Sequence, residues 1–176
     1  LVGGSFPIRR GGGAAQLDYS KWLLDQGANL GIFPEGTRST SRHMARFKHG
    51  VAILYDCHSI RSHIPFLFEG TLPDFNIGTA GGATCDPRIE AATHRICQAS
   101  VRTTVLNGRF KGGWTTRHYG RPQEGIHAIQ MELAQSTHLA SEAAPYAYDP
   151  ARADALRPIL SEILLSLADL APDLRG

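Results

Sequence analysis

Short apolar runs alternate along this chain with longer segments of helical periodicity, and this alternation constrains the fold more than any other feature. Residues 156–170 carry leucine and isoleucine at helical spacing and predict an amphipathic helix. Because strands that alternate with helices build parallel sheets, we expect an α/β fold with a largely parallel sheet flanked by helices. The apolar runs that predict strands are residues 5–8, 30–33, 51–55, 101–106 and 126–133.

Two further helices are predicted from their ends. Residues 14–26 carry an apolar stripe, and Gly27 follows as a C-cap. Asp86 followed by proline has the arrangement of an N-cap and a first helical turn, and it predicts a helix that continues to about Ala99. We expect residues 69–87, which are rich in glycine, asparagine and proline, to be irregular.

The composition is that of a globular protein, and it excludes several classes. Hydrophobic residues make up 42% and charged residues 19% of the 176 positions, so general disorder is excluded. A formal net charge of +2 is too small to predict a nucleic-acid partner. The 3 cysteines have no paired spacing and indicate reduced thiols in a cytoplasmic protein. No run approaches the roughly 18 apolar residues of a transmembrane segment.

The first third of the chain contains a specific motif, F-P-E-G-T-R-S at residues 33–39. A block F-P-I-R-R precedes this motif, and a block F-K-x-G follows it. Over about residues 1–53 these blocks resemble the glycerolipid (1-acylglycerol-3-phosphate) acyltransferases of phospholipid synthesis. The resemblance implies that arginine side chains fork onto the phosphate of the acceptor and that a glycine lets the backbone approach it. The implied phosphate-binding residues are Arg9, Arg10, Glu35, Gly36, Thr37 and Arg38.

The same family uses a histidine and an aspartate spaced H-x-x-x-x-D, upstream of these blocks. This chain opens on Leu1 and contains that spacing nowhere. We therefore expect a substrate-binding portion without its catalytic base, and no acyl transfer. Contact with a membrane surface is expected only through residues 1–53.

Five blocks in the rest of the chain follow the order of a second family. They are Y-D-C-H-S-I-R-S (55–62), P-D-F-N-I-G-T (73–79), N-G-R-F-K-G-G (107–113), T-R-H-Y-G (116–120) and H-A-I-Q-M-E-L (127–133). Over residues 50–176 the chain resembles N-formylglutamate deformylase (N-formylglutamate amidohydrolase). The resemblance implies a carboxypeptidase-like hydrolase fold. It also implies a zinc-dependent step of histidine degradation, in which N-formyl-L-glutamate and water give glutamate and formate.

A histidine follows residues 51–57, whose first five residues are apolar. If these form a buried strand, His58 lies at its carboxyl end, where open α/β sheets place their sites. His58 is then either a zinc ligand whose other ring nitrogen bonds an acceptor such as Asp56, or a structural histidine at a strand end. The deformylase resemblance favours the ligand. Cys57 points the opposite way and is expected in the core.

A glutamate stands inside the apolar run of residues 126–133. Strand alternation places Ala128, Gln130 and Glu132 on one face. A buried glutamate is costly unless it has a partner or a task. By resemblance to the carboxypeptidase-like hydrolases, Glu132 is the general base that activates water and passes the proton to the leaving amine. The alternative is a glutamate paired with a loop arginine, and the two roles are compatible.

A glycine-interrupted basic loop follows residues 101–106. A small dicarboxylate substrate needs two cationic partners, for which arginine offers bidentate geometry. The alternative is a solvated basic loop without a role in binding. The predicted substrate-binding residues are Arg61, Asn107, Arg109, Lys111, Arg117 and His118.

The implied zinc site is expected to be incomplete. Two of its three ligands come from an upstream segment in the hydrolase family, and an acyltransferase-like segment stands there in this chain. The two resemblances meet at residues 49–54, which one family needs as a helix and the other as a strand. We interpret the chain as a hybrid of an acyltransferase-like βαβ fragment (1–53) and the carboxyl-terminal part of a deformylase (50–176). Three hypotheses stay open: an impaired amidohydrolase, an acyltransferase fragment, and a catalytically silent chain that binds anions.

Overall fold

A computed structural model describes residues 51–174 of the protein. These residues belong to the second of two compact units, Phe47–Gly176. The strands predicted at residues 5–8 and 30–33 and the helix predicted at residues 14–26 lie outside the described residues. The predicted phosphate-binding residues between Arg9 and Arg38 lie outside them as well.

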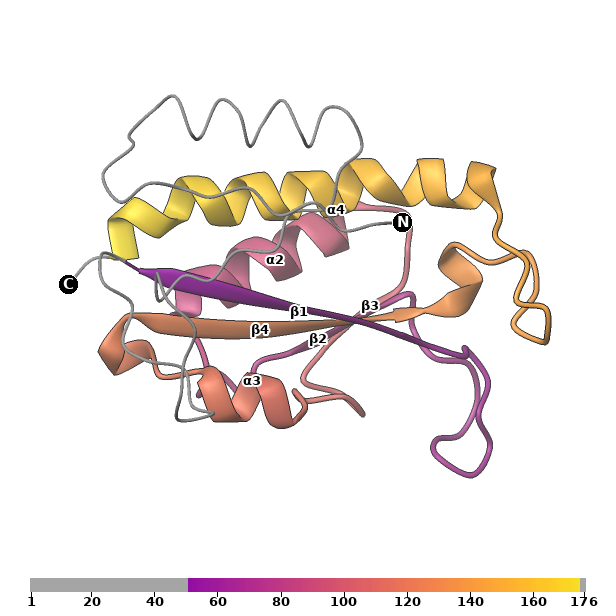
Figure 1. The fold of residues 1–176 in the computed structure, drawn as a ribbon, viewed down its shortest axis with the longest axis horizontal. Coiled ribbons are helices and arrows are strands. Elements are labelled where there is room, and N and C mark those ends of the chain that lie inside the picture. Colours follow the sequence, from indigo (N-terminus) through magenta and orange to yellow (C-terminus); the bar gives the residue numbers. More distant parts are fainter. Residues whose placement is uncertain (1–50, 175–176) are drawn as a thin grey trace, which may run out of the picture. The chain divides into compact units, whose positions relative to one another are not determined.

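A four-stranded sheet forms the centre of the described unit (Figure 1). Its order is β1 (Ala52–Ile60), β4 (Ile126–Ala134), β2 (Phe75–Gly78) and β3 (Thr104–Leu106). The pairs β1–β4 and β2–β3 are parallel, whereas β2 and β4 run antiparallel. The predicted α/β fold with a largely parallel sheet is confirmed, with one antiparallel pair added.

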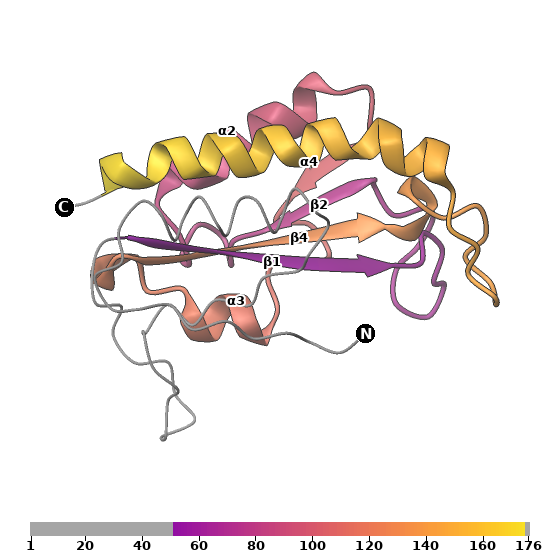
Figure 2. The same ribbon diagram turned by 45° about the horizontal axis from the view of Figure 1, so that its top comes forward.

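Helices cover both faces of this sheet. The long helices α2 (Pro87–Ala99) and α4 (Pro150–Leu170) lie on one face, and the short helix α3 (Trp114–Tyr119) lies on the other (Figures 1 and 2). Single turns of 3₁₀ helix complete the unit. They are Pro122–Glu124, Gln135–Thr137 and Ala171–Leu174.

The core lies between the sheet and the pair α2 and α4. Ile129 and Met131 of β4 are at most 1% exposed and meet Ile163 of α4 there. These β4 residues alternate with Ala128 and Gln130, as the predicted strand alternation requires. Because α3 covers the opposite face, β4 is buried on both sides, and even its polar residues are withdrawn from water.

Several predicted elements have different limits in the structure. The segment expected to be irregular contains β2, which is buried throughout. The strand predicted at residues 101–106 is only three residues long, and Val101 is fully exposed. Part of the predicted basic loop forms α3. The last helix begins at Pro150 rather than at residue 156, because Asp149 caps it there.

The first strand is longer and less buried than predicted. It continues to Ile60, so His58 lies within the strand rather than beyond its end. The strand is half-buried over its first part, and Cys57, His58 and Ser59 are exposed. The prediction that Cys57 belongs to the core is therefore wrong.

The cap of α2 generates a prediction on stability. The Asp86 carboxylate accepts a hydrogen bond from the Arg88 backbone N–H at 2.9 Å and from two guanidinium nitrogens, Nε at 2.9 Å and Nη2 at 3.0 Å. These bonds from Arg88 lower the pKa of Asp86 to about 2. We expect Asp86→Ala to cost about 1 kcal/mol of stability at pH 7. Asp86→Asn keeps a cap and should cost less.

The pH dependence follows from the direction of this shift. A lowered folded-state pKa stabilises the protein, and this stabilisation is fully present above the unfolded pKa of about 3.9. The stabilisation is lost as the pH falls toward 2 and Asp86 is protonated. In thermal denaturation followed by circular dichroism, the gap between wild type and Asp86→Asn should therefore close between pH 5 and pH 2. A gap that stays constant over this range would contradict the assignment.

Candidate functional site

The register of two parallel strands brings the two principal candidate residues together. Asp56 of β1 is the partner of Gln130, and His58 is the partner of Glu132. Adjacent parallel strands end at the same edge of a sheet, so these residues lie toward the carboxyl ends of both strands. Asp56 and Gln130 both bond to the α3 region, which places the group on the α3 face.

Asp56 orients the His58 imidazole. Its Oδ1 lies 2.9 Å from Nε2 of His58, and its Oδ2 accepts a hydrogen bond from the Thr116 hydroxyl at 3.3 Å. The Asp56 side chain is 13% exposed and that of His58 is 48% exposed. A fixed carboxylate thus holds one ring nitrogen, while the imidazole stays open to solvent. The contact between Asp56 and His58 was expected from the sequence, whereas zinc ligation by His58 stays a prediction.

Glu132 is buried at 7% exposure and has its own polar partners. Gln130 Nε2 donates to Glu132 Oε2 at 3.2 Å, and Gln130 Oε1 accepts a hydrogen bond from the Gly113 backbone N–H. Burial raises the pKa of Glu132, and the nearby His58 and the Gln130 bond oppose this rise. A raised carboxylate pKa suits a general base that works near neutral pH. Among residues 51–174, no arginine forms an ion pair with Glu132.

The role of Gln130 was missed from the sequence, although its position on the face of Glu132 was expected. Gln130 is 4% exposed, so both ends of its amide must be bonded inside the protein. It joins Glu132 to the N-terminus of α3. A glutamine two residues before the candidate base in a buried strand was the signal that could have revealed this contact.

Asn107 builds the loop beside the site. Its backbone adopts a φ of +51°, and its side-chain oxygen accepts from the N–H groups of Thr79 at 2.9 Å and Gly81 at 3.2 Å. Its amide nitrogen donates to the Thr79 hydroxyl at 2.9 Å and to Glu90 at 3.2 Å. The structure therefore assigns Asn107 a loop-building contact, and its predicted role in substrate binding stays a prediction.

The cationic candidates lie in different settings. Arg109 Nε donates to the Leu67 carbonyl at 3.0 Å, and Arg117 Nη1 donates to the Gly112 carbonyl at 2.8 Å. The His118 ring stacks on Trp114 with 4.2 Å between the ring centroids. Arg61 and Lys111 are exposed. Both readings of this surface, as a substrate site and as a solvated basic loop, stay open.

The described residues fit one ligand position of a zinc site. His58 offers an imidazole with a carboxylate on its other nitrogen, the arrangement typical of zinc-bound histidine. Catalytic zinc takes three protein ligands. Within residues 51–174, no cluster of three histidine, cysteine, aspartate or glutamate side chains is suitably placed. His127 lies on the opposite face of β4 from Glu132, and its Nδ1 accepts a hydrogen bond from the Asp86 backbone N–H at 3.1 Å.

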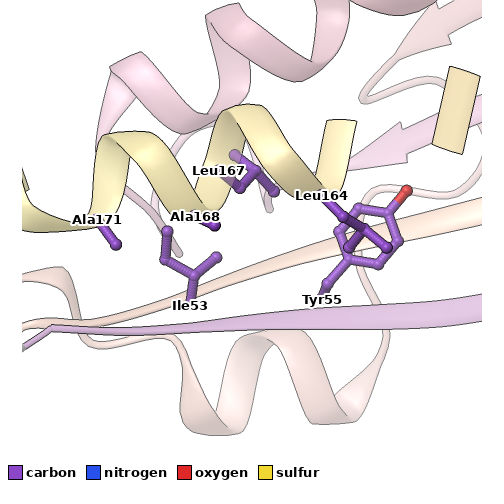
Figure 3. A pocket seen from close by; sticks show the side chains of 6 residues that line it. All are labelled: Ile53, Tyr55, Leu164, Leu167, Ala168 and Ala171. Atoms are coloured by element: carbon purple, nitrogen blue, oxygen red, sulfur yellow. The ribbon is translucent and has the colours of Figure 1, made fainter. Parts of the chain in front are cut away.

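A pocket of about 260 Å³ lies on the opposite face of the sheet (Figure 3). Ile53 and Tyr55 of β1 line it from below, and α4 closes it with Leu164, Leu167 and Ala168. Tyr55 and Asp56 are successive residues of one strand, so their side chains point to opposite faces. This pocket contains no charged side chain and is separate from the site of His58 and Glu132.

Comparison with known proteins identifies the family. A family model described as N-formylglutamate amidohydrolase matches residues 38–139, which is more than half of the chain. The chain belongs to the N-formylglutamate amidohydrolase family. A second model, described as acyltransferase, matches residues 2–64. Both resemblances predicted from the motifs are thus confirmed, and their matches overlap over residues 38–64.

Two curated relatives are named N-formylglutamate deformylase. The one from Pseudomonas aeruginosa is 51% identical over 133 residues, which cover 74% of this chain and 50% of the relative. The one from Pseudomonas putida is 48% identical over 133 residues, which cover 75% of this chain and 49% of the relative. The chain therefore spans about half the length of the curated relatives it matches.

A solved structure shares the fold. The N-formylglutamate amidohydrolase from Ralstonia eutropha JMP134 superimposes with a TM-score of 0.53 at 20% sequence identity. The match covers 71% of this chain and 45% of that structure. At this identity the likeness supports the fold alone. Among the helices of residues 51–174, none has the length and apolar character needed to cross a membrane.

Two glycines hold the basic loop against the sheet, and this contact generates a second prediction. A Cβ added to Gly78 at the end of β2 would lie 2.4 Å from the backbone nitrogen of Gly112. Backbone cannot yield as a flexible side chain does, so we expect Gly78→Ala to cost about 1–3 kcal/mol or more in urea denaturation. Gly70→Ala is the control, because its added Cβ would meet nothing within 4 Å. At φ +71° that control should lose only about 1 kcal/mol. Equal losses in both variants would contradict the close approach.

Proposed function

We propose that the β1–β4 pair of this chain carries part of the catalytic site of an amidohydrolase that cleaves N-formyl-L-glutamate to glutamate and formate. The observation that carries this proposal is the pairing of His58 with Glu132 in adjacent parallel strands. Asp56 fixes the imidazole and Gln130 fixes the carboxylate, so both groups are oriented before a substrate binds. The choice of substrate follows the names of the two relatives, which are both called N-formylglutamate deformylase.

In the proposed reaction, Glu132 acts as the general base. It takes a proton from water as the water oxygen forms a bond to the formyl carbon, and it delivers that proton to the amide nitrogen as the C–N bond breaks. The products are formate and the free amine of glutamate. A zinc ion, when bound, supplies the acidity that makes this water reactive at neutral pH. His58 would hold it through Nδ1, because Asp56 occupies Nε2.

The proposed substrate carries two carboxylates, which cationic side chains of the protein would bind. Arg61 lies directly after β1, Arg109 and Lys111 lie in the loop that precedes α3, and Arg117 lies within α3. Arg109 and Arg117 are each tethered to a backbone carbonyl, so their side chains are partly ordered without a ligand. We expect a small dicarboxylate to bridge these cations and Arg61, with His118 at the margin of the same surface.

We expect the chain by itself to retain zinc poorly. Residues 51–174 offer one imidazole and no three-residue cluster, so further ligands must come from outside them. We expect slow or undetectable formate release from the chain alone. Joining residues 50–176 to the part of the Pseudomonas aeruginosa deformylase outside the matched half should restore zinc binding and formate release.

The decisive experiment compares variants of that chimera in a formate-release assay. Glu132→Gln should lower kcat by about 100-fold or more, because it removes the general base. His58→Ala should lose both zinc and activity. The controls are Glu124→Gln, an exposed residue of a 3₁₀ turn, and His94→Ala on α2. Full activity in Glu132→Gln would refute the role of Glu132, and an inactive, zinc-loaded chimera would refute the proposed function.

The acyltransferase match favours a second candidate function, transfer of an acyl group to lysophosphatidate by residues 1–53. The end of that match, however, includes β1, which pairs along its whole length with β4. We therefore propose that this portion binds anions without acyl transfer. The full chain, incubated with an acyl donor and lysophosphatidate, should form no phosphatidate. Formation of phosphatidate that Arg38→Ala abolishes would establish the acyltransferase instead.

A further inference from the structure

A carboxylate beyond β4 holds the chain just beyond β1. Glu142 accepts two hydrogen bonds from the Ser62 backbone N–H, at 3.0 Å to Oε1 and 3.1 Å to Oε2. It accepts a third from the Ser62 hydroxyl, at 2.8 Å to Oε2. The two residues lie 80 positions apart in the sequence and are partly buried. Charge-assisted bonds of this kind are the strong ones in proteins.

Both ends of this contact are anchored. The Ser62 carbonyl accepts a hydrogen bond from the Leu72 N–H at 2.8 Å, so the N–H, hydroxyl and carbonyl of Ser62 are all bonded. On the other side, Leu139 and Tyr148 form an isolated β-bridge across the base of the Glu142 loop. Arg152 of α4 donates to the Leu139 carbonyl at 2.6 Å. Glu142 therefore extends from a braced loop, not from a free segment.

The position of this contact gives it a functional consequence. Ser62 directly follows Arg61, the exposed cation closest in sequence to His58. The Glu142 carboxylate bonds both the backbone N–H and the hydroxyl of Ser62, so it fixes the position of this residue. Fixing Ser62 fixes the backbone from which the Arg61 side chain extends. A long arginine side chain loses less entropy on binding a carboxylate when its backbone is already held.

We propose that Glu142 is a positioning residue: through Ser62 it holds Arg61 ready to bind a carboxylate of the substrate. This inference rests on the proposed function, because the ligand that Arg61 would bind is the dicarboxylate substrate proposed there. A loop staple with no role in binding would stabilise the protein equally well. The two roles differ in one respect, since only a positioning role makes the effect of Glu142 on ligand affinity depend on Arg61.

The experiment measures binding of N-formyl-L-glutamate and of L-glutamate to the full chain by NMR titration, so it needs neither zinc nor turnover. We expect Glu142→Ala to weaken binding about 10-fold, in line with the loss of a hydrogen bond to a charged group. Glu142→Gln, which keeps an acceptor, should lie between this variant and wild type. Ser62→Ala should have the smallest effect, because both backbone bonds remain. Glu162→Ala on the exposed face of α4 is the control.

The double variant Arg61→Ala/Glu142→Ala decides between the two roles. If Glu142 acts through Arg61, adding Glu142→Ala to Arg61→Ala should change affinity less than twofold. An equal loss with and without Arg61 would overturn the proposal. The conservative variants Glu142→Gln and Ser62→Ala keep this test available if Glu142→Ala does not fold.

Amide hydrogen exchange separates failure of this inference from failure of the proposed function. Glu142→Ala should speed exchange at the Arg61 and Ser62 amides at least about 10-fold and leave the amides of α2 unchanged. If wild type binds neither ligand, the inference is overturned, whereas the proposed substrate is tested separately by formate release from the chimera. Unchanged exchange at both amides overturns the inference whatever the ligand result.

Discussion

The parallel pairing of β1 with β4 is the interaction on which the rest of the described structure depends. It aligns nine residue pairs, from Ala52 with Ile126 to Ile60 with Ala134. One set of side chains faces α2 and α4 and joins the core, and the alternate set faces α3 and forms the site. A slip of one residue would turn every side chain of β1 to the other face. The same register thus determines both the hydrophobic packing and the distance between His58 and Glu132.

Burial of β4 on both faces explains why the site is built from paired polar groups. Gln130 and Glu132 are withdrawn from water by α3, and an unbonded polar group there would cost about 1–3 kcal/mol. Each is therefore bonded, Gln130 to Gly113 and Glu132 to Gln130. From the other side, Asn76 of β2 donates to the Glu132 carbonyl at 3.1 Å. The constraint that stabilises the sheet also keeps the candidate base in one orientation, with a raised pKa.

The elements that could be predicted from the sequence are those whose own hydrophobic periodicity or helix-capping residues identify them without knowledge of their tertiary contacts. β1, β4, α2 and α4 were found, and the motifs led to His58 and Glu132. β2 was missed because Asn76 and Gly78 resemble loop residues. The Asn76 amide is satisfied by the carbonyls of Pro73 and Glu132, and Gly78 lies against Gly112. Glu142 was missed because its partner lies 80 positions away, a contact that no local pattern encodes.

The overlap of the two family matches shows how tertiary pairing decides between competing local demands. Residues 38–64 match both families, and residues 49–54 were expected to be under opposed demands. In the structure Ala52, Ile53 and Leu54 are strand residues paired with Ile126, His127 and Ala128. A backbone cannot be in a helix and donate to a neighbouring strand at the same time. In one molecule, the helix implied by the acyltransferase resemblance and the β1–β4 site therefore exclude each other, and the nine paired residues favour the hydrolase arrangement.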